Sequence, residues 1–408
     1  MPDDLSSPIS LEAFRGEVQA WLEVNFPKAL AGRRSQAEAG EEGREDLADW
    51  KRALCGKGWG TPTWPSPYGG GGLTPVQARV LREEIRRVGG WNPIGWGMGV
   101  RMLGPTLLEY GTEAQKQQHI PPICRGETRW CQGYSEPGAG SDLAALQTKA
   151  EDRGDHFLVN GQKLWTSGAQ YADWCFCLVR TDPTRKHDGI SFLLIDMRSP
   201  GVRVNPIQLI SGRSPFCETF FTDVQVSKAN LVGPLNGGWT VGKRLLQYER
   251  QRNEDAPARA TEQRAIEEVA AEQLGRDAQG RLADPDYRAR LTRHLMDRKA
   301  FNLTLQRSIV EAGGGGPTAA TSILKNVSSL LVQERSELLV EALGQAVGWE
   351  GETFAPEELA YVREWLSGKA NTIFAGSYEI QNNIISKRIL GLPDPVASET
   401  GGLSGQRP

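Results

Sequence analysis

The spacing of apolar residues changes twice along the chain, and this double change constrains the fold more than any other feature. From Ser10 to Phe26 apolar residues recur at helical spacing, and Pro27 predicts the end of that helix. After Trp130 short runs typical of β-strands replace the helical pattern, and beyond Gly233-Pro234 the helical pattern returns. This order predicts an α+β chain with an N-terminal all-α domain, a middle antiparallel β domain and a C-terminal four-helix-bundle domain.

Turn-rich segments between these patterns set the expected boundaries. A chain of 408 residues is expected to form two or three domains. We expect an N-terminal α-helical domain (1–125), a middle β-sheet domain (126–235), a C-terminal helical bundle (236–395) and a disordered tail (396–408). The expected helices cover residues 10–26, 46–56, 75–88, 112–120, 239–253, 257–274, 285–312, 317–347, 356–370 and 379–390. The expected strands cover residues 156–160, 162–165, 174–180, 190–195, 202–207 and 219–226. Asn160-Gly161 predicts a two-residue hairpin turn between the first two strands.

Charge and composition exclude several classes of protein. The chain carries 47 Lys and Arg against 50 Asp and Glu, so it lacks the positive charge of a nucleic-acid-binding protein. Its six cysteines and four histidines show no metal-ligand spacing. No run approaches the ~18 apolar residues that a membrane span needs, and no apolar segment follows the acidic N-terminus. We therefore expect a cytoplasmic protein that binds no nucleic acid, membrane or metal.

Three common catalytic motifs are absent or incomplete. The segment from Gly237 to Lys243 resembles a phosphate-binding loop, but Arg244 stands where a Ser or Thr would hold magnesium. No Gly-x-Gly-x-x-Gly follows a strand, which argues against a Rossmann nucleotide site. Ser135 fails the nucleophile-elbow pattern because Pro137 occupies the position that needs Gly.

Two polar segments lie where the helical pattern gives way to strands. The first, Cys131-Gln-Gly-Tyr-Ser-Glu-Pro-Gly-Ala-Gly-Ser-Asp142, exposes many backbone N–H groups and suits a planar polar ring or a phosphate. A structural turn is the alternative interpretation. The second, Lys163-Leu-Trp-Thr-Ser-Gly168, places an aromatic ring beside hydroxyl donors, although a Trp in such a pattern also fits a protein core.

Three segments resemble the signatures of the acyl-CoA dehydrogenase family. Residues 131–142 resemble its first signature, Lys163–Ser167 resemble its flavin-contacting segment, and Ile373-Phe-Ala-Gly-Ser-Tyr-Glu-Ile-Gln381 resembles its C-terminal motif. The resemblance extends from about residue 10 to residue 393. It implies an FAD enzyme that removes two hydrogens from Cα and Cβ of an acyl-CoA and passes electrons to an electron-transfer flavoprotein.

The same resemblance assigns residues to the cofactor and the substrate. The implied FAD contacts are Gln132, Tyr134, Ser135, Gly140, Ser141, Trp165, Thr166, Ser167, Arg276, Glu341, Gly344, Ser377 and Glu379. Glu341 and Gly344 belong to a segment that resembles a loop touching the FAD of a neighbouring subunit. The implied substrate contacts are Ser141, Tyr248, Arg250, Ala375 and Gly376. A shared FAD site further implies a homodimer or homotetramer, or a heterotetramer with a second chain.

The catalytic base is where this chain departs from many relatives. Ala375 stands where many members carry the Glu that takes the α-proton, and Ala cannot accept a proton. A minority of the family places the base before an Arg on the first helix of the bundle, where this chain has Glu249-Arg250. Glu249 is therefore our candidate base, and a solvated glutamate on a charged helix is the alternative.

Three functions remain open at this stage. The first is dehydrogenation by Glu249 of a branched or bulky, ring-bearing acyl group. The second is a base-deficient partner subunit of a heteromeric acyl-CoA dehydrogenase, suggested by Ala375. The third is a flavin monooxygenase of the same fold, which would use reduced flavin with oxygen.

Overall fold

A computed structural model describes residues 10–33, 43–95, 97–250, 264–311, 321–344, 348 and 353–393. The chain divides into two compact units, Met1–Gln263 and Arg264–Pro408, and each is considered separately below. The expected tail (396–408) lies outside the described residues.

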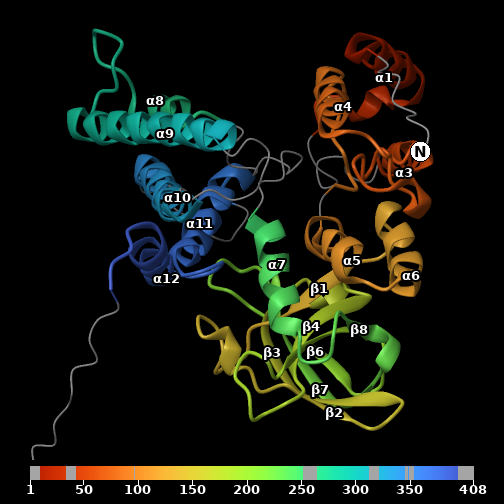
Figure 1. The fold of residues 1–408 in the computed structure, drawn as a ribbon. Coiled ribbons are helices and arrows are strands. Elements are labelled where there is room, and N and C mark those ends of the chain that lie inside the picture. The colour runs from red at the N-terminus through yellow and green to blue at the C-terminus, as the bar shows by residue number, and fades with distance from the viewer. Residues whose placement is uncertain are drawn as a thin grey trace, which may run out of the picture. The chain divides into compact units, whose positions relative to one another are not determined.

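Unit 1 begins with a group of helices packed around an aromatic core. The helices are α1 (Leu11–Asn25), α3 (Arg44–Gly56), α4 (Pro75–Arg87), α5 (Gly104–Tyr110) and α6 (Glu113–Cys124) (Figure 1). Ser10, Thr74 and Thr112 cap α1, α4 and α6 by accepting a hydrogen bond from a backbone N–H of the first turn. The indole ring of Trp50 is fully buried and packs edge-on against Phe26. Helix α5 was not expected from the sequence.

The middle of unit 1 is a sheet of eight strands. They are β1 (Trp130–Gly133), β2 (Lys149–Asp152), β3 (His156–Ser167), β4 (Trp174–Arg180), β5 (Ile190–Asp196), β6 (Val202–Ile207), β7 (Phe216–Ser227) and β8 (Leu231–Val232). Their spatial order is β6-β7-β3-β2-β4-β5-β8, with β1 beside β4. Most neighbours are antiparallel, but β4 pairs in parallel with β1 and β2. The short strands β1, β2 and β8 were missed by the sequence analysis.

The hairpin turn predicted at Asn160-Gly161 is wrong. Residues 156–167 form one continuous strand, β3, which pairs with β7 along its length. Gly161 has a φ of 154° and marks a shift in that pairing. A Cβ atom at Gly161 would lie 2.7 Å from the Cα of Thr148, so the glycine permits close approach of two backbones. The fold does require a glycine at this position, but for the close packing of two backbones and not for a turn.

Helix α7 (Gly238–Arg250) lies against the sheet within unit 1 (Figure 1). Val241 and Leu245 are buried in the same core cluster as Leu178 of β4 and Phe192 of β5. A Cβ atom at Gly238 would lie 2.3 Å from the backbone carbon of Ser191, so only glycine allows this contact with β5. The start of α7 is thereby fixed to the sheet.

Unit 2 is helical. Its helices are α8 (Ile266–Leu274), α9 (Pro285–Glu311), α10 (Thr321–Leu343), α11 (Pro356–Gly368) and α12 (Tyr378–Ile384). Leu338 and Leu339 of α10 are buried with Ile266 of α8 and Tyr361 of α11. The hydroxyl of Tyr287 donates a 2.8 Å hydrogen bond to the carbonyl of Leu338 and joins α9 to α10. The expected fold class, with helices before and after a central sheet, is confirmed.

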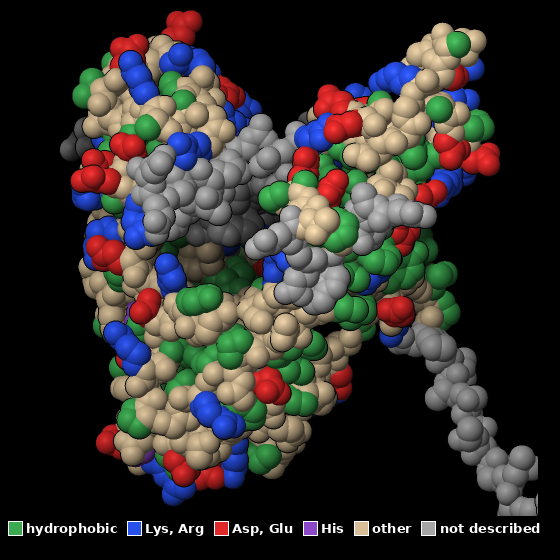
Figure 2. All heavy atoms as spheres, turned by 180° about the vertical axis from the view of Figure 1, so that it is seen from behind, with side chains coloured by type: hydrophobic (Ala, Val, Ile, Leu, Met, Phe, Trp, Pro, Cys, Tyr) green, Lys and Arg blue, Asp and Glu red, His purple; other side chains and the backbone are tan. Residues whose placement is uncertain are grey.

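The surface matches the near-neutral composition. On the face drawn in Figure 2, basic and acidic side chains are intermixed. Within the described ranges, no helix combines the length and the apolar composition that crossing a bilayer requires.

Candidate cofactor and substrate site

The glycine-rich segment 131–142 forms strand β1 and a tight loop after it. The backbone N–H groups of Glu136 and Ala139 each donate to the carbonyl of the other, at 2.9 and 3.1 Å. Gly138 and Gly140 are exposed, and a Cβ atom at either would meet nothing within 4 Å. The loop therefore presents bare backbone to open space, which suits the close approach of a flat polar group.

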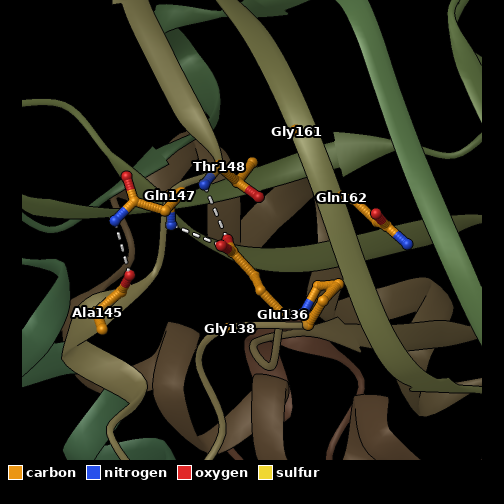
Figure 3. Close-up of a pocket in the computed structure, with 8 residues that line it drawn as sticks. Glu136, Gly138, Ala145, Gln147, Thr148, Gly161 and Gln162 are labelled. Carbon is orange, nitrogen blue, oxygen red and sulfur yellow. Dashed lines mark hydrogen bonds between the residues drawn. The ribbon is translucent and has the colours of Figure 1, made fainter.

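A buried ion pair joins this loop to strand β3. The side chains of Lys163 and Glu136 are 0% and 6% exposed, and Lys163 Nζ lies 2.7 Å from Glu136 Oε1. The same ammonium donates to the carbonyl of Tyr134 at 3.2 Å. The backbone N–H groups of Gln147 and Thr148 donate to the Glu136 carboxylate at 2.6 and 2.9 Å (Figure 3). Both charges are thus hydrogen-bonded, as burial requires.

The pairing controls the ionisation of Glu136. Burial alone would raise the pKa of this carboxyl, but the positive charge of Lys163 and the hydrogen bonds outweigh it and hold the pKa below 4.5. Because the pKa is lowered in the folded state, the stabilisation is present above the unfolded value of 4.5. This stabilisation is lost as the pH falls through the lowered pKa that Glu136 has in the folded protein.

A pocket of about 470 Å³ adjoins Glu136. It is lined by Glu136, Pro137, Gly138, Ala145, Gln147, Thr148, Gly161 and Gln162 (Figure 3). None of the site residues predicted from the sequence is among them. The pocket therefore gives no support to the predicted contacts.

Trp165 has a backbone conformation that is rare for a bulky residue. Its φ is 62°, at a point where the pairing of β3 with β7 shifts between Lys163 and Thr166. Such a conformation costs about 1–3 kcal/mol and is most often found at functional sites. The indole is 50% exposed and packs edge-on against Phe216, with ring centroids 6.0 Å apart. With this backbone conformation, the indole of Trp165 is exposed to solvent.

The two polar segments are adjacent in the structure. The backbone N–H of Leu164 donates a 2.8 Å hydrogen bond to the carbonyl of Ser135. Ser135 and Ser167 are partly exposed, whereas Thr166 is buried and its hydroxyl has no partner among the described residues. Exposed backbone, an outward indole and two accessible hydroxyls fit the flat, polar isoalloxazine ring of a flavin. The sequence placed Thr166 at the cofactor, but its side chain points inward.

Three other predicted contacts from segment 131–142 differ in their exposure to solvent. Gln132 is half-buried on β1, where it pairs with Phe176 of β4, and Ser141 is exposed. Tyr134 is 5% exposed, and its ring packs edge-on against Phe176 and Phe192. A flavin above the loop could thus meet the backbone of Tyr134 but not its ring.

Glu249 lies near the C-terminal end of α7, close to the half-buried cation Arg101. The π-helical turn Gly99–Leu103 carries Arg101, whose Nη2 is 3.5 Å from the carbonyl oxygen of Glu249. Burial lowers the pKa of Arg101, and the Glu249 carboxylate partly offsets this effect. Burial also raises the pKa of Tyr134 well above 10, and the same carboxylate raises it further. The Glu249 carboxylate is therefore close to both side chains and is half-buried, not fully solvated.

Tyr248 makes a contact that the sequence did not predict. Its hydroxyl donates to Glu109 of α5 at 2.5 Å, and Arg244 Nε donates to the same carboxylate oxygen at 2.8 Å. This network ties α7 to α5, so the Tyr248 hydroxyl already has a structural partner. No motif marks Glu109, since it lies 139 residues from Tyr248. The side chain of Arg250 lies outside the described residues.

The remaining predicted residues belong to unit 2. Ala375 and Gly376 have φ angles of 55° and 91°, and Ser377 caps α12 by accepting from the N–H of Ile380 at 3.4 Å. Glu379, in the first turn of α12, is exposed. The predicted substrate and cofactor contacts of the C-terminal motif thus share one tight turn.

Two further predicted residues of unit 2 have protein partners. Arg276 Nη1 donates to the carbonyl of Gly280 at 2.7 Å, and Glu341 is paired with Arg290. Gly344 has a φ of 58° at the end of α10. An FAD contact by Arg276 or Glu341 would therefore share or replace an existing bond.

The histidines serve packing and local pairing. His119 lies edge-on to both Trp130 and Trp174, and burial lowers its pKa to about 4. His294 is paired with Glu334 across α9 and α10. In the described part of the chain, no group of three or more His, Cys, Asp or Glu side chains could hold a metal ion.

Comparison with known proteins places the whole chain in one family. Three family models match in succession: acyl-CoA dehydrogenase N-terminal domain (residues 10–127), middle domain (131–224) and C-terminal domain (236–390). Acyl-CoA dehydrogenase IpdE1 of Mycobacterium tuberculosis is 37% identical over 393 residues, which cover 94% of this chain and 98% of that protein. IpdE1 of Mycolicibacterium smegmatis is 35% identical over 409 residues, 95% and 99% of the two chains.

Solved structures agree. The chain is similar to a structure titled "Tcur3481-Tcur3483 steroid ACAD", with 29% identity, a TM-score of 0.71, and coverage of 96% of this chain and 100% of that one. The ChsE4-ChsE5 complex of Mycobacterium tuberculosis gives 29% identity and a TM-score of 0.70 at the same coverage. The family expected from the sequence is confirmed.

Removing one member of the buried ion pair should destabilise unit 1 strongly. We expect Lys163→Met to lower the free energy of unfolding by about 3–5 kcal/mol, because it leaves the Glu136 carboxylate buried without its counter-charge. Denaturant unfolding followed by circular dichroism measures the change. Lys186→Met removes a pair with Asp142 in which both side chains are more than half exposed, and should cost less than about 1 kcal/mol. Equal losses in the two variants would contradict the proposed role of burial.

Proposed function

The chain belongs to the acyl-CoA dehydrogenase family, and we propose that it catalyses the FAD-dependent α,β-dehydrogenation of an acyl-CoA thioester. In this proposal Glu249 removes the α-proton. The single observation that carries the assignment is the half-buried position of Glu249, whose carboxylate acts electrostatically on Arg101 and Tyr134.

The proposed FAD contacts begin with the exposed loop backbone at Gly138–Gly140 and the outward indole of Trp165. Bound flavin supplies the acceptor for the hydride that leaves Cβ. The hydroxyls of Ser135 and Ser167 orient the ring, and exposed Ser141 is available to the CoA chain. The buried Glu136–Lys163 pair fixes the loop and the Trp165 segment in register, so the contacts are in place before the cofactor binds. Gln132, Arg276, Glu341, Gly344, Ser377 and Glu379 remain proposed contacts.

Glu249 supplies the base that Ala375 cannot provide. A carboxylate takes a carbon-bound proton only when water does not solvate it fully, since desolvation strengthens the base. Helix α7 holds Glu249 on the sheet side through Val241 and Leu245, and Tyr248 locks the same turn to α5 through Glu109. The proton therefore moves to the side chain of a residue whose helix is fixed at two points, on the sheet and on α5.

The tight turn at Ala375 and Gly376 supplies the proposed contact with the thioester. Replacement of a glutamate by Ala375 leaves the backbone N–H intact, and such a donor stabilises negative charge that develops on the thioester oxygen. The φ angles of both residues belong to a conformation that favours glycine.

The substrate class follows from the relocated base and from the relatives. A base on α7 instead of the C-terminal motif changes the shape of the acyl pocket, and we propose a bulky, ring-bearing acyl group. A solved relative is titled a steroid acyl-CoA dehydrogenase, which supports this choice. We propose an electron-transfer flavoprotein as the acceptor of the electrons.

A heteromeric assembly is the second candidate. Ala375 suggests it from the sequence, and the similar ChsE4-ChsE5 structure is a complex of two chains. Unit 2 also exposes large apolar side chains, as a subunit interface would. They include Met296, Leu303, Leu330, Ile373, Phe374, Leu390 and Leu392. In this candidate the chain works as an oligomer with a related second chain.

Replacement of the base should stop flavin reduction. We expect anaerobic mixing with a ring-bearing acyl-CoA to bleach the flavin of the wild-type protein, and Glu249→Gln to slow this step by about 10³-fold or more, because the amide cannot accept the proton. Stopped-flow absorbance at the flavin band measures the rate. Glu268→Gln, at an exposed site on α8, is the matched control and should react normally. Normal bleaching by Glu249→Gln would rule out the assignment.

Removal of the outward indole should weaken cofactor binding. We expect Trp165→Ala to raise the dissociation constant of FAD about tenfold, because stacking of an aromatic ring contributes on the order of 1–3 kcal/mol. Tyr171→Ala removes another exposed aromatic ring and should leave the affinity unchanged. Titration of the apoprotein with FAD, followed by flavin fluorescence, gives both constants.

Purification separates the two assemblies. If the chain is complete alone, it should purify yellow, with a homodimeric or homotetrameric mass by light scattering. If the heteromeric candidate holds, it should gain FAD and reach tetramer mass only after mixing with a second, related acyl-CoA dehydrogenase chain. A colourless monomer under both conditions would contradict both candidates.

A further inference from the structure

We propose that Lys325 is a positioning residue for the reaction: its ammonium group holds the backbone segment that aims the N–H of Ala375 at the thioester oxygen. Lys325 touches neither substrate nor cofactor in this proposal. It acts through the carbonyl of Asn371, four residues before Ala375. This inference rests on the dehydrogenase function proposed above and adds a support for its thioester contact. Every residue in the argument belongs to unit 2.

The first observation is the bonding of the Lys325 side chain. Lys325 on α10 is half-buried, and its Nζ donates to the carbonyl of Asn371 at 2.6 Å and to the hydroxyl oxygen of Ser329 at 2.9 Å. The Ser329 hydroxyl also lies 2.9 Å from the same carbonyl oxygen. A charged donor makes a shorter and stronger hydrogen bond than a neutral one. Two side chains of α10 thus hold one carbonyl of the segment that precedes the turn.

The second observation concerns the charge of this ammonium group. Burial lowers the pKa of Lys325, and no acidic group of the described residues offsets the effect. A partly desolvated ammonium destabilises the folded protein unless its hydrogen bonds compensate. Nearby Lys369, by contrast, is paired with Glu337, and both of those side chains are about half exposed. An ion pair therefore does not explain the position of the Lys325 charge, whose shortest contact is the Asn371 carbonyl.

The third observation is the short path from Asn371 to the turn. Asn371 belongs to the 3₁₀ turn Lys369–Thr372, and the backbone N–H of Phe374 donates back into that turn at 3.0 Å. The chain is thus hydrogen-bonded up to the residue before Ala375. The Lys325 ammonium lies 6.0 Å from the centre of the Phe374 ring. The bond at Asn371 is therefore close enough to control where the turn begins.

The fourth observation is that α10 also holds the other side of the turn. The side chain of Asn326 on α10 donates to the side-chain oxygen of Asn382 on α12 at 2.9 Å. A Cβ atom at Gly376 would lie 2.5 Å from Nε2 of Gln381, which is buried. Helix α10 contacts both α11 and α12 (Figure 1). Ala375 therefore lies between two segments that are both bonded to the same part of α10.

The backbone of Ala375 needs such support. Its φ of 55° is rare for a residue with a Cβ atom, and such a conformation persists only where the surrounding structure enforces it. An N–H group stabilises charge that develops on a thioester oxygen only when it already points at that oxygen. Without the Lys325 bond the turn can relax, and the Ala375 N–H would lose its direction.

The test uses the FAD-loaded protein and (cyclohexylthio)acetyl-CoA, which carries sulfur at the β position. Its α-proton can be removed, but no hydride can follow, so the enolate remains beside oxidised flavin and gives a long-wavelength charge-transfer absorbance. We expect Lys325→Met to keep its FAD but to weaken formation of this enolate about tenfold, because a misdirected N–H stabilises the negative oxygen less. Lys325→Arg keeps the charge and the donors and should restore most of the absorbance.

Two further variants separate positioning from general loosening of unit 2. Lys369→Met removes the exposed pair with Glu337, which also joins the 3₁₀ turn to α10, and should leave the absorbance unchanged. Ser329→Ala removes the second group at the Asn371 carbonyl while keeping the ammonium, and should weaken the absorbance by less than Lys325→Met.

Each result decides between distinct accounts. Wild-type absorbance in Lys325→Met, or equal weakening in Lys369→Met, would overturn the inference and leave the dehydrogenase function standing. If Lys325→Met fails to fold or loses its FAD, Ser329→Ala decides: weakened absorbance supports the inference and unchanged absorbance overturns it. Absence of the charge-transfer absorbance in the wild-type protein would instead reject the proposed function itself.

Discussion

The buried ion pair between Glu136 and Lys163 is the interaction on which the proposed cofactor site depends. It joins the glycine-rich loop to strand β3 with almost no exposure to water, and two backbone N–H groups complete the bonding of the carboxylate. Because each charge needs the other, the loop cannot move away from β3 without leaving an unpaired buried charge. Trp165, with its strained backbone and exposed indole, lies two residues after Lys163 on the same strand. The fixed glycine-rich loop and the strained backbone of Trp165 are therefore neighbouring parts of the proposed cofactor site.

Helix α7 carries the proposed catalytic base. Its glycines at the start allow close packing on the sheet, and its end carries Glu249 near Arg101 and Tyr134. Tyr134 keeps a hydroxyl that the fold does not satisfy. Trp165 keeps a strained backbone conformation, of a kind that costs stability and is found most often at functional sites.

The spacing of apolar residues predicted helices and strands well in segments where a single periodicity dominates. Strands β4 and β6 have the predicted bounds, because β4 is a continuous apolar run and β6 begins with valines alternating with polar residues. Gly161 misled the analysis, since a glycine needed for close packing gives the same signal as a turn. The Glu136–Lys163 pair spans 27 residues, and Tyr248 and Glu109 are farther apart still, so only the folded chain reveals these contacts. The sequence motifs named the loop and Trp165, but not that Thr166 and the ring of Tyr134 point inward.

The central claim is that Glu249 acts as the base in place of Ala375. A crystal structure of the protein with FAD and an unreactive acyl-CoA analogue tests it most directly. The account predicts a Glu249 carboxylate oxygen about 3–3.5 Å from Cα of the analogue, on the side away from the flavin. A Glu249 side chain turned into solvent, or another carboxylate at that distance from Cα, would contradict it.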